Sequence, residues 1–128
     1  MGYVYILIVE NLKITGKFFI EIKLIFMAKK LKIDSKLMYK KFHEIWDKQE
    51  TNGYCICYAT GVKLYRNSYR DNSCVYHHVL LKSKYPQYAL EEWNIVIVHP
   101  DAHTQVHSNI RKCPKIMELT EKLKEEFT

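Results

Sequence analysis

Residues 93–107 read WNIVIVHPDAHTQVH and residues 76–78 read YHH, and together they hold five of the six histidines. The β-branched run 94–98 predicts a strand, and Pro100 directly after it suits the first turn of a helix. Residues 74–80 predict an earlier strand, which a loop joins to the later one. The order strand, loop, strand, helix therefore places histidines on the first strand and on the helix.

The histidine spacing predicts a metal site. His103 and His107 are four residues apart, so on a helix their rings lie on one face, one turn apart. The pair His77-His78 ends the first strand and can add a third ligand and a free base. Neighbouring strand residues face opposite sides, so both can serve one site only where the backbone bends. Three imidazoles would leave coordination positions open, as in catalytic sites.

The complete pattern resembles a known family. Asn94 stands sixteen residues after His78, and a proline precedes the two helix histidines. This arrangement is similar to the HNH endonucleases, particularly the colicin-type and phage-type members that carry a His-His pair. The resemblance covers about residues 57–113, close to half the chain, and includes the weaker matches CYATG at 57–61 and KSKYP at 82–86. It implies a ββα-metal core with its motif in residues 74–110.

The resemblance also implies a function and the residues that perform it. An HNH enzyme hydrolyses DNA phosphodiester bonds with one divalent metal ion, which is Mg²⁺, Mn²⁺, Zn²⁺ or Ni²⁺. Imidazole ligands favour Zn²⁺ and Ni²⁺. His77, His103 and His107 would bind the metal, and His78 would be the general base. Asn94 would orient His78 and tie the loop to the helix.

DNA is the expected partner, contacted mainly through its phosphate backbone because no sequence-reading module is recognisable. Sequence preference is then weak and salt dependence strong. Basic residues just before the site and in the loop between its strands are the candidate phosphate contacts, with exposed surface residues as the alternative: Arg66, Arg70, Lys82 and Lys84. The sequence does not indicate an oligomeric state.

Two other functions compete with the nuclease. One is a catalytically inactive HNH-fold module that binds nucleic acid. The other is a structural zinc protein that uses Cys55, Cys57, Cys74 and Cys113. The only close cysteine pair has C-x-C spacing and not the C-x2-4-C of zinc fingers, so buried reduced thiols are the default expectation.

The remaining sequence predicts an α+β fold in which one helix precedes the core and another follows it. The first helix starts near Asp34 and ends at residues 51–53, with an apolar face of Leu37, Met38, Phe42, Ile45 and Trp46. A short strand over 54–58 and a polar connector over 62–73 follow. The last helix starts at Pro114 and carries Ile116, Leu119, Leu123 and Phe127. His43 and His99 are expected to be structural or surface residues.

Length and composition suit one globular domain. The 128 residues are 48% apolar and carry a formal charge of +6, which excludes collagen-like and wholly disordered chains. Seven lysines against four acidic residues put much of the basic surplus in residues 27–50. A lysine-rich helix is more often a solvated face than a phosphate-binding one.

Residues 1–26 form a β-prone extension of different composition, and residues 27–128 are the expected nuclease domain. We hypothesise that Met27 is the natural start and that the extension is either an over-extended reading frame, not translated natively, or a dispensable arm. The N-terminus lacks a secretory signal, and charged residues interrupt its apolar run before it could span a membrane. The expected location is therefore cytoplasmic, in a bacterial or phage-infected host cell.

Overall fold

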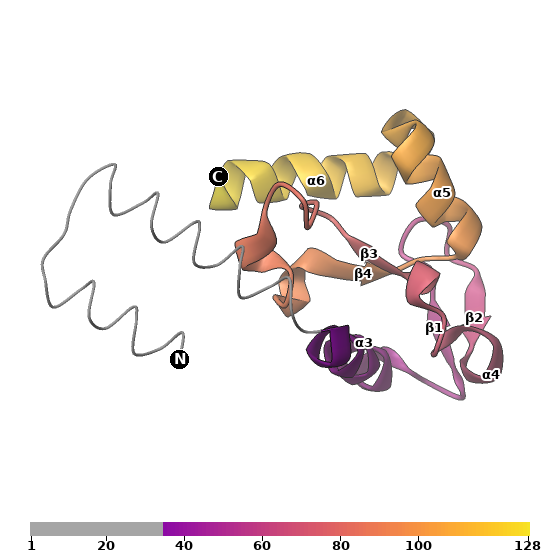
Figure 1. Cartoon of the computed structure of the whole chain (residues 1–128). Helices are drawn as coiled ribbons and strands as arrows, with labels where there is room; N and C mark the ends of the chain where they lie inside the picture. Colours follow the sequence, from indigo (N-terminus) through magenta and orange to yellow (C-terminus); the bar gives the residue numbers. More distant parts are fainter. Residues whose placement is uncertain (1–34) are drawn as a thin grey trace, which may run out of the picture. The chain divides into compact units, whose positions relative to one another are not determined.

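A two-stranded antiparallel sheet and the helix that follows it lie at the centre of the fold. The computed structural model describes residues 35–128. In it β3 (Tyr76–His78) pairs with β4 (Ile95–Ile97), and α5 (Pro100–Ser108) comes directly after (Figure 1). This confirms the predicted order of strand, loop, strand and helix. Both strands are shorter than predicted because 3₁₀ turns at Ser73–Val75 and Glu92–Asn94 take up the flanking residues.

The first helix, α3 (Ser35–Gln49), forms as predicted and buries Phe42, Ile45 and Trp46. Leu37 was expected on the same buried face but is 42% exposed, because only the later turns of α3 pack into the core. Asn52 and Gly53 follow with positive φ angles of 56° and 84°. Glycine adopts this left-handed conformation without strain, so the chain reverses sharply here.

Residues 54–69 form a hairpin and a short helix, which corrects the prediction of a polar connector over 62–73. β1 (Tyr54–Ile56) pairs antiparallel with β2 (Lys63–Tyr65), and α4 (Arg66–Tyr69) follows at once. In β2 only Leu64 is buried, so the alternation of buried and exposed residues is too short to predict a strand from the sequence. Gly61, with a φ of 79°, permits the turn between the strands.

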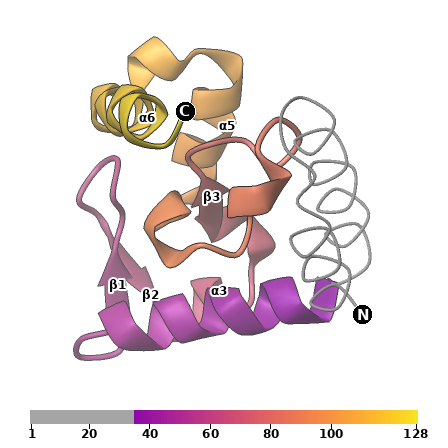
Figure 2. The same cartoon turned by 90° about the vertical axis from the view of Figure 1, so that its left-hand side faces the viewer.

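The last helix, α6 (Pro114–Phe127), starts at the predicted proline and packs against the loop between β3 and β4. Its Leu123 joins Val79 and Leu80 of that loop in a small second core. The rings of Phe127 and Trp93 stack with their centroids 3.9 Å apart. Figure 2 shows α3 along one side of β3, with α5 and α6 on the other.

The main core joins α3, both two-stranded sheets, α5 and the start of α6, so the described part is a small α+β fold. The stack of Phe42 on Tyr76, with centroids 4.4 Å apart, is its central contact between α3 and β3. The β-prone extension over 1–26 and the proposed start at Met27 lie outside the described residues. No helix within residues 35–128 is long and apolar enough to cross a membrane.

Candidate metal centre

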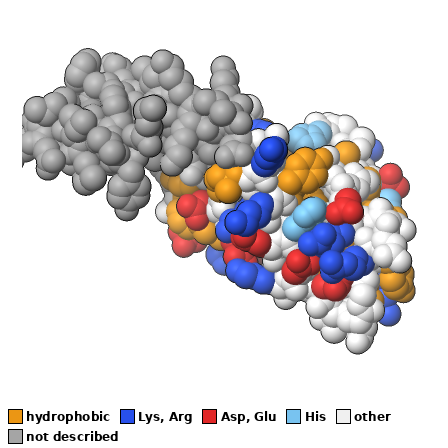
Figure 3. All heavy atoms as spheres, turned by 60° about the horizontal axis from the view of Figure 1, so that its bottom comes forward, with side chains coloured by type: hydrophobic (Ala, Val, Ile, Leu, Met, Phe, Trp, Pro, Cys, Tyr) orange, Lys and Arg blue, Asp and Glu red, His pale blue; other side chains and the backbone are white. Residues whose placement is uncertain are grey.

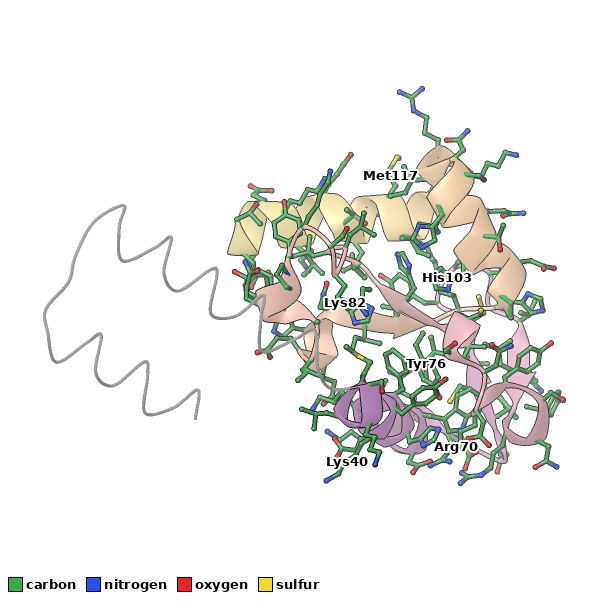
Figure 4. All side chains as sticks on the ribbon, viewed as in Figure 1. Lys40, Arg70, Tyr76, Lys82, His103 and Met117 are labelled. Carbon is green, nitrogen blue, oxygen red and sulfur yellow. The ribbon has the colours of Figure 1, made fainter. Side chains whose placement is uncertain are left out.

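Three histidines converge where β3 meets α5. One ligating nitrogen each from His77, His103 and His107 lies within 4.8 Å of the others. The ring centroids are 5.1 Å apart for His77 and His103, and 4.9 Å apart for His103 and His107. His103 lies on the side of α5 that faces the sheet (Figure 4). The predicted ligand set is therefore brought together by one strand and one helix.

The backbone fixes which nitrogen His103 can offer. Its Nδ1 lies 2.6 Å from the carbonyl oxygen of Cys74, so Nδ1 carries the proton and donates it. The lone pair is then on Nε2. Metal-binding histidines typically donate their other N–H to a carbonyl or carboxylate in this way. His103 is thus preset as an Nε2 ligand.

His77 is the buried member of the cluster. It is 2% exposed, and its Nδ1 is buried with no hydrogen-bond partner. Burial, reinforced by the neighbouring His103 and His107, lowers the pKa of His77 to about 3. An unpartnered buried polar atom costs free energy, and a cation would satisfy it if Nδ1 is the nitrogen that faces the other two histidines. The neutral imidazole is also the form that binds a metal. A divalent ion therefore fits these three residues.

No family model, curated protein or solved structure matches the chain.

His78 lies on the other face of β3. Strand pairing continues through it, opposite Ile95, so no bend turns its ring toward His77. The ring instead lies 5.9 Å from that of Phe42 on α3, and none of its described ring contacts is with the cluster. Its Nε2 is 2.8 Å from the Ala89 carbonyl and donates to it, which leaves Nδ1 as a proton acceptor.

Electrostatics nevertheless link His78 to the site. Burial is the main cause that lowers the pKa of His78, and the charges of Lys82 and His103 lower it further. The hydrogen bond to the carbonyl of Ala89 opposes this shift. His78 is therefore neutral at pH 7 and able to accept a proton.

Asn94 is fully buried and holds the loop between β3 and β4. Its Oδ1 accepts the N–H of Leu80 at 2.7 Å, and its Nδ2 donates to the carbonyls of Leu80 and Tyr88, both at 3.1 Å. None of these bonds goes to His78, which Asn94 was predicted to orient, and none forms the predicted tie to α5. Because Ala89 follows Tyr88, Asn94 acts on His78 only through the loop that carries the Ala89 carbonyl.

Arg66 and Arg70 are occupied by carboxylates of α3. Arg70 makes two hydrogen bonds of 3.0 Å to Asp47, and Arg66 reaches both Asp47 and Glu50. The hydrogen bond from Arg70 is the largest cause that lowers the pKa of Asp47. Figure 3 shows basic and acidic side chains intermixed on this side of the molecule. These arginines connect α4 and the residue after it to α3 through ion pairs, and they do not lie with the histidine cluster.

Lys84 is the predicted phosphate contact that lies at the cluster. It lines a cavity of about 200 Å³ together with His77, His107 and Lys124. Lys82 lies in the same loop, close enough for its charge to act on His78. Lys124 is not among the residues predicted from the sequence, because no local pattern indicates that α6 packs against the loop between β3 and β4.

The four cysteines do not converge. Cys55 lies near the carbonyl of Trp46, Cys57 accepts the backbone N–H of His99, and Cys113 lies near the carbonyl of Ala102. Cys74 is exposed. Within residues 35–128 the three histidines are the only group of three or more His, Cys, Asp or Glu side chains close enough together to hold one metal ion. The cysteines are therefore arranged as separate thiols.

Proposed function

We propose that this chain is a divalent-metal-dependent endonuclease of the HNH type that hydrolyses phosphodiester bonds in DNA. The convergence of His77, His103 and His107 on a strand–strand–helix unit carries the proposal. Three neutral imidazoles leave coordination positions for a phosphate oxygen and water, which favours a catalytic site over a structural one.

A bound metal ion would stabilise the negative charge that develops on the phosphate and on the leaving 3′ oxygen. His78 would accept a proton from the attacking water at Nδ1, and because its ring contacts Phe42 on the face away from the cluster, the ring would have to turn toward the metal to do so. The water oxygen forms a bond to phosphorus as the bond to the 3′ oxygen breaks. The 3′ oxygen takes a proton from solvent, which leaves 5′-phosphate and 3′-hydroxyl ends.

Asn94 would support this step as a positioning residue. Its three hydrogen bonds fix the loop at Leu80 and Tyr88, next to the carbonyl that selects the tautomer of His78. A free loop would let Ala89 move and remove that selection.

A second candidate is a metal-dependent DNA-binding module that does not hydrolyse its ligand. It is favoured by one observation, the placement of the His78 ring against Phe42 on the face away from the cluster. On this alternative the three-histidine site and its lysines would hold a phosphate without activating water.

Plasmid nicking distinguishes the two. Supercoiled DNA is incubated with the full chain and Mg²⁺, Mn²⁺, Zn²⁺ or Ni²⁺, and relaxed product is quantified. We expect the wild type to nick the plasmid. H78A should nick it at least about 100-fold more slowly, because general base catalysis contributes roughly 10²–10⁴-fold to the rate. H43A is the control, since His43 lies outside the cluster and pairs with Asp71.

Metal and DNA binding are measured on the same variants. H78A should still bind both, whereas H103A should lose the metal. A wild type that binds metal and DNA but cuts with none of these ions supports the second candidate and refutes the nuclease. Equal nicking by wild type and H78A refutes the role assigned to His78.

A further inference from the structure

The cavity beside the histidine cluster has features that the metal site does not use. His77 and His107 form part of its wall, so a ligand in the cavity lies next to a metal held by these residues. The rest of the wall comes from the loop after β3 and from α6. A group bound there would adjoin the reacting phosphate without being that phosphate.

The wall has two chemical parts. Leu80, Val106 and Ile110 supply an apolar surface, and Tyr85 adds an aromatic ring. Apolar and aromatic walls are what enzymes use to hold a base that has left the helical stack. Stacking on an aromatic side chain tolerates any base, because every base has a flat π face.

Lys84 and Lys124 bring positive charge to the same cavity from two different segments. Both are exposed, and neither pairs with a carboxylate within residues 35–128. By contrast, Arg66 and Arg70 are taken up by acidic partners. These two lysines are therefore available for an anionic ligand.

The size of the cavity restricts the ligand. At about 200 Å³ it is smaller than the roughly 300–1,000 Å³ of sites for drug-sized molecules. It can admit one base with its sugar, but a base pair or a duplex groove cannot enter. A nucleotide held in it would therefore have to be unpaired.

We propose that this cavity is a nucleotide subsite that holds one unpaired nucleotide beside the scissile phosphate, with Lys84 and Lys124 on the adjoining phosphates. The proposal rests on the proposed function and names its substrate class. The preferred DNA contains an unpaired nucleotide, as in a single strand or a bulge, and a perfect duplex is a poorer ligand.

The first test is binding in EDTA, which needs neither a metal nor cleavage. Fluorescence anisotropy of the full chain is measured with a labelled duplex that contains one bulged nucleotide and with the perfect duplex. The bulged DNA should bind about tenfold more tightly. Competition should be stronger with thymidine monophosphate than with inorganic phosphate, because only the nucleotide fills the apolar part. Equal competition would reduce the cavity to an anion site and overturn the proposal.

The second test uses matched variants of α6. K124M and K122M remove the same charge from one helix, but only Lys124 lines the cavity. K124M should abolish most of the tenfold preference, and K122M should preserve it. Y85F should also preserve it, whereas Y85A should lose it, with thermal melting as the check on folding. The same loss in K124M and K122M would contradict the subsite.

Failure of this inference is separable from failure of the proposed function. A chain that nicks plasmid but shows no preference for the bulge keeps its nuclease function and loses the subsite. A chain that prefers the bulge in EDTA but cuts no DNA with any metal keeps the subsite and loses the nuclease function.

Discussion

The Nδ1 atom of His103 lies 2.6 Å from the carbonyl oxygen of Cys74, and this bond joins α5 to the turn that precedes β3. It holds the ring of His103 toward His77 and directs its Nε2 lone pair into the cluster. The backbone carbonyl of Cys74 thus determines which nitrogen of His103 can bind a metal. No sequence pattern could have predicted this contact.

Removing His103 should abolish tight metal binding. H103A eliminates a ligand, and we expect Zn²⁺ affinity to fall by more than the roughly 10–100-fold typical of lost supporting contacts. Competition titration with a chromophoric chelator measures the change. T104A is the matched control, because Thr104 is the next residue on α5 and is exposed. Unchanged affinity in H103A would place the metal elsewhere.

The stability of the metal-free protein should fall as the pH falls. The pKa of His77 is about 3 in the folded chain and about 6.5 in the unfolded chain, so between these values only the unfolded state takes up the proton. The contribution is complete above pH 6.5 and decreases toward pH 3. It amounts to about 2 kcal/mol lost between pH 7 and pH 5.

Urea unfolding in EDTA at pH 7 and pH 5 measures this loss. His78 and His103 also have lowered pKa values and add to it with the same sign. H77Q should reduce the difference between the two pH values, whatever its effect on stability at pH 7. An equal difference in H77Q and wild type would show that His77 is not buried in its neutral form.

Asn94 should be important for stability. N94A leaves the buried N–H of Leu80 and two carbonyls without their partner, so we expect a loss of roughly 2–4 kcal/mol in the free energy of unfolding. N109A is the control, since exposed Asn109 caps a short turn and its loss should cost about 1 kcal/mol. Similar losses in the two variants would contradict the loop-holding role.

Lys84 and Arg70 should differ in their effect on DNA binding. Because Arg70 is bound to Asp47 and Lys84 is free at the cavity, K84A should weaken DNA binding and reduce its salt dependence by about one counterion. R70A should leave DNA affinity nearly unchanged and reduce stability by about 1 kcal/mol or less. Salt titrations of DNA affinity measure the first effect, and the opposite ranking would restore Arg70 as a phosphate contact.

Local patterns predicted much of this fold. The proline that opens α5, the β-branched run of β4 and the apolar face of α6 each contain their own signal, and all three elements form, with β4 shorter than expected. The i, i+4 spacing of His103 and His107 likewise predicted their convergence. In these cases a few neighbouring residues carry the information.

Features that depend on distant contacts were missed. The hairpin strand β2 shows one buried residue, Leu64, and forms because it covers the core beside α3. Arg66 and Arg70 looked like phosphate contacts because the carboxylates of α3 that hold them are about twenty residues earlier in the chain. The cavity exists only because α6 packs on the loop that contains Lys84.

The most direct test of the three-histidine site is the absorption spectrum of the Co²⁺-loaded full chain, compared with H77A and with a variant in which all four cysteines are serine. We expect one Co²⁺ per chain, visible d–d bands without the near-ultraviolet band of cobalt–thiolate bonds, and loss of binding in H77A alone. Thiolate bands that vanish in the cysteine variant while H77A binds normally would contradict it.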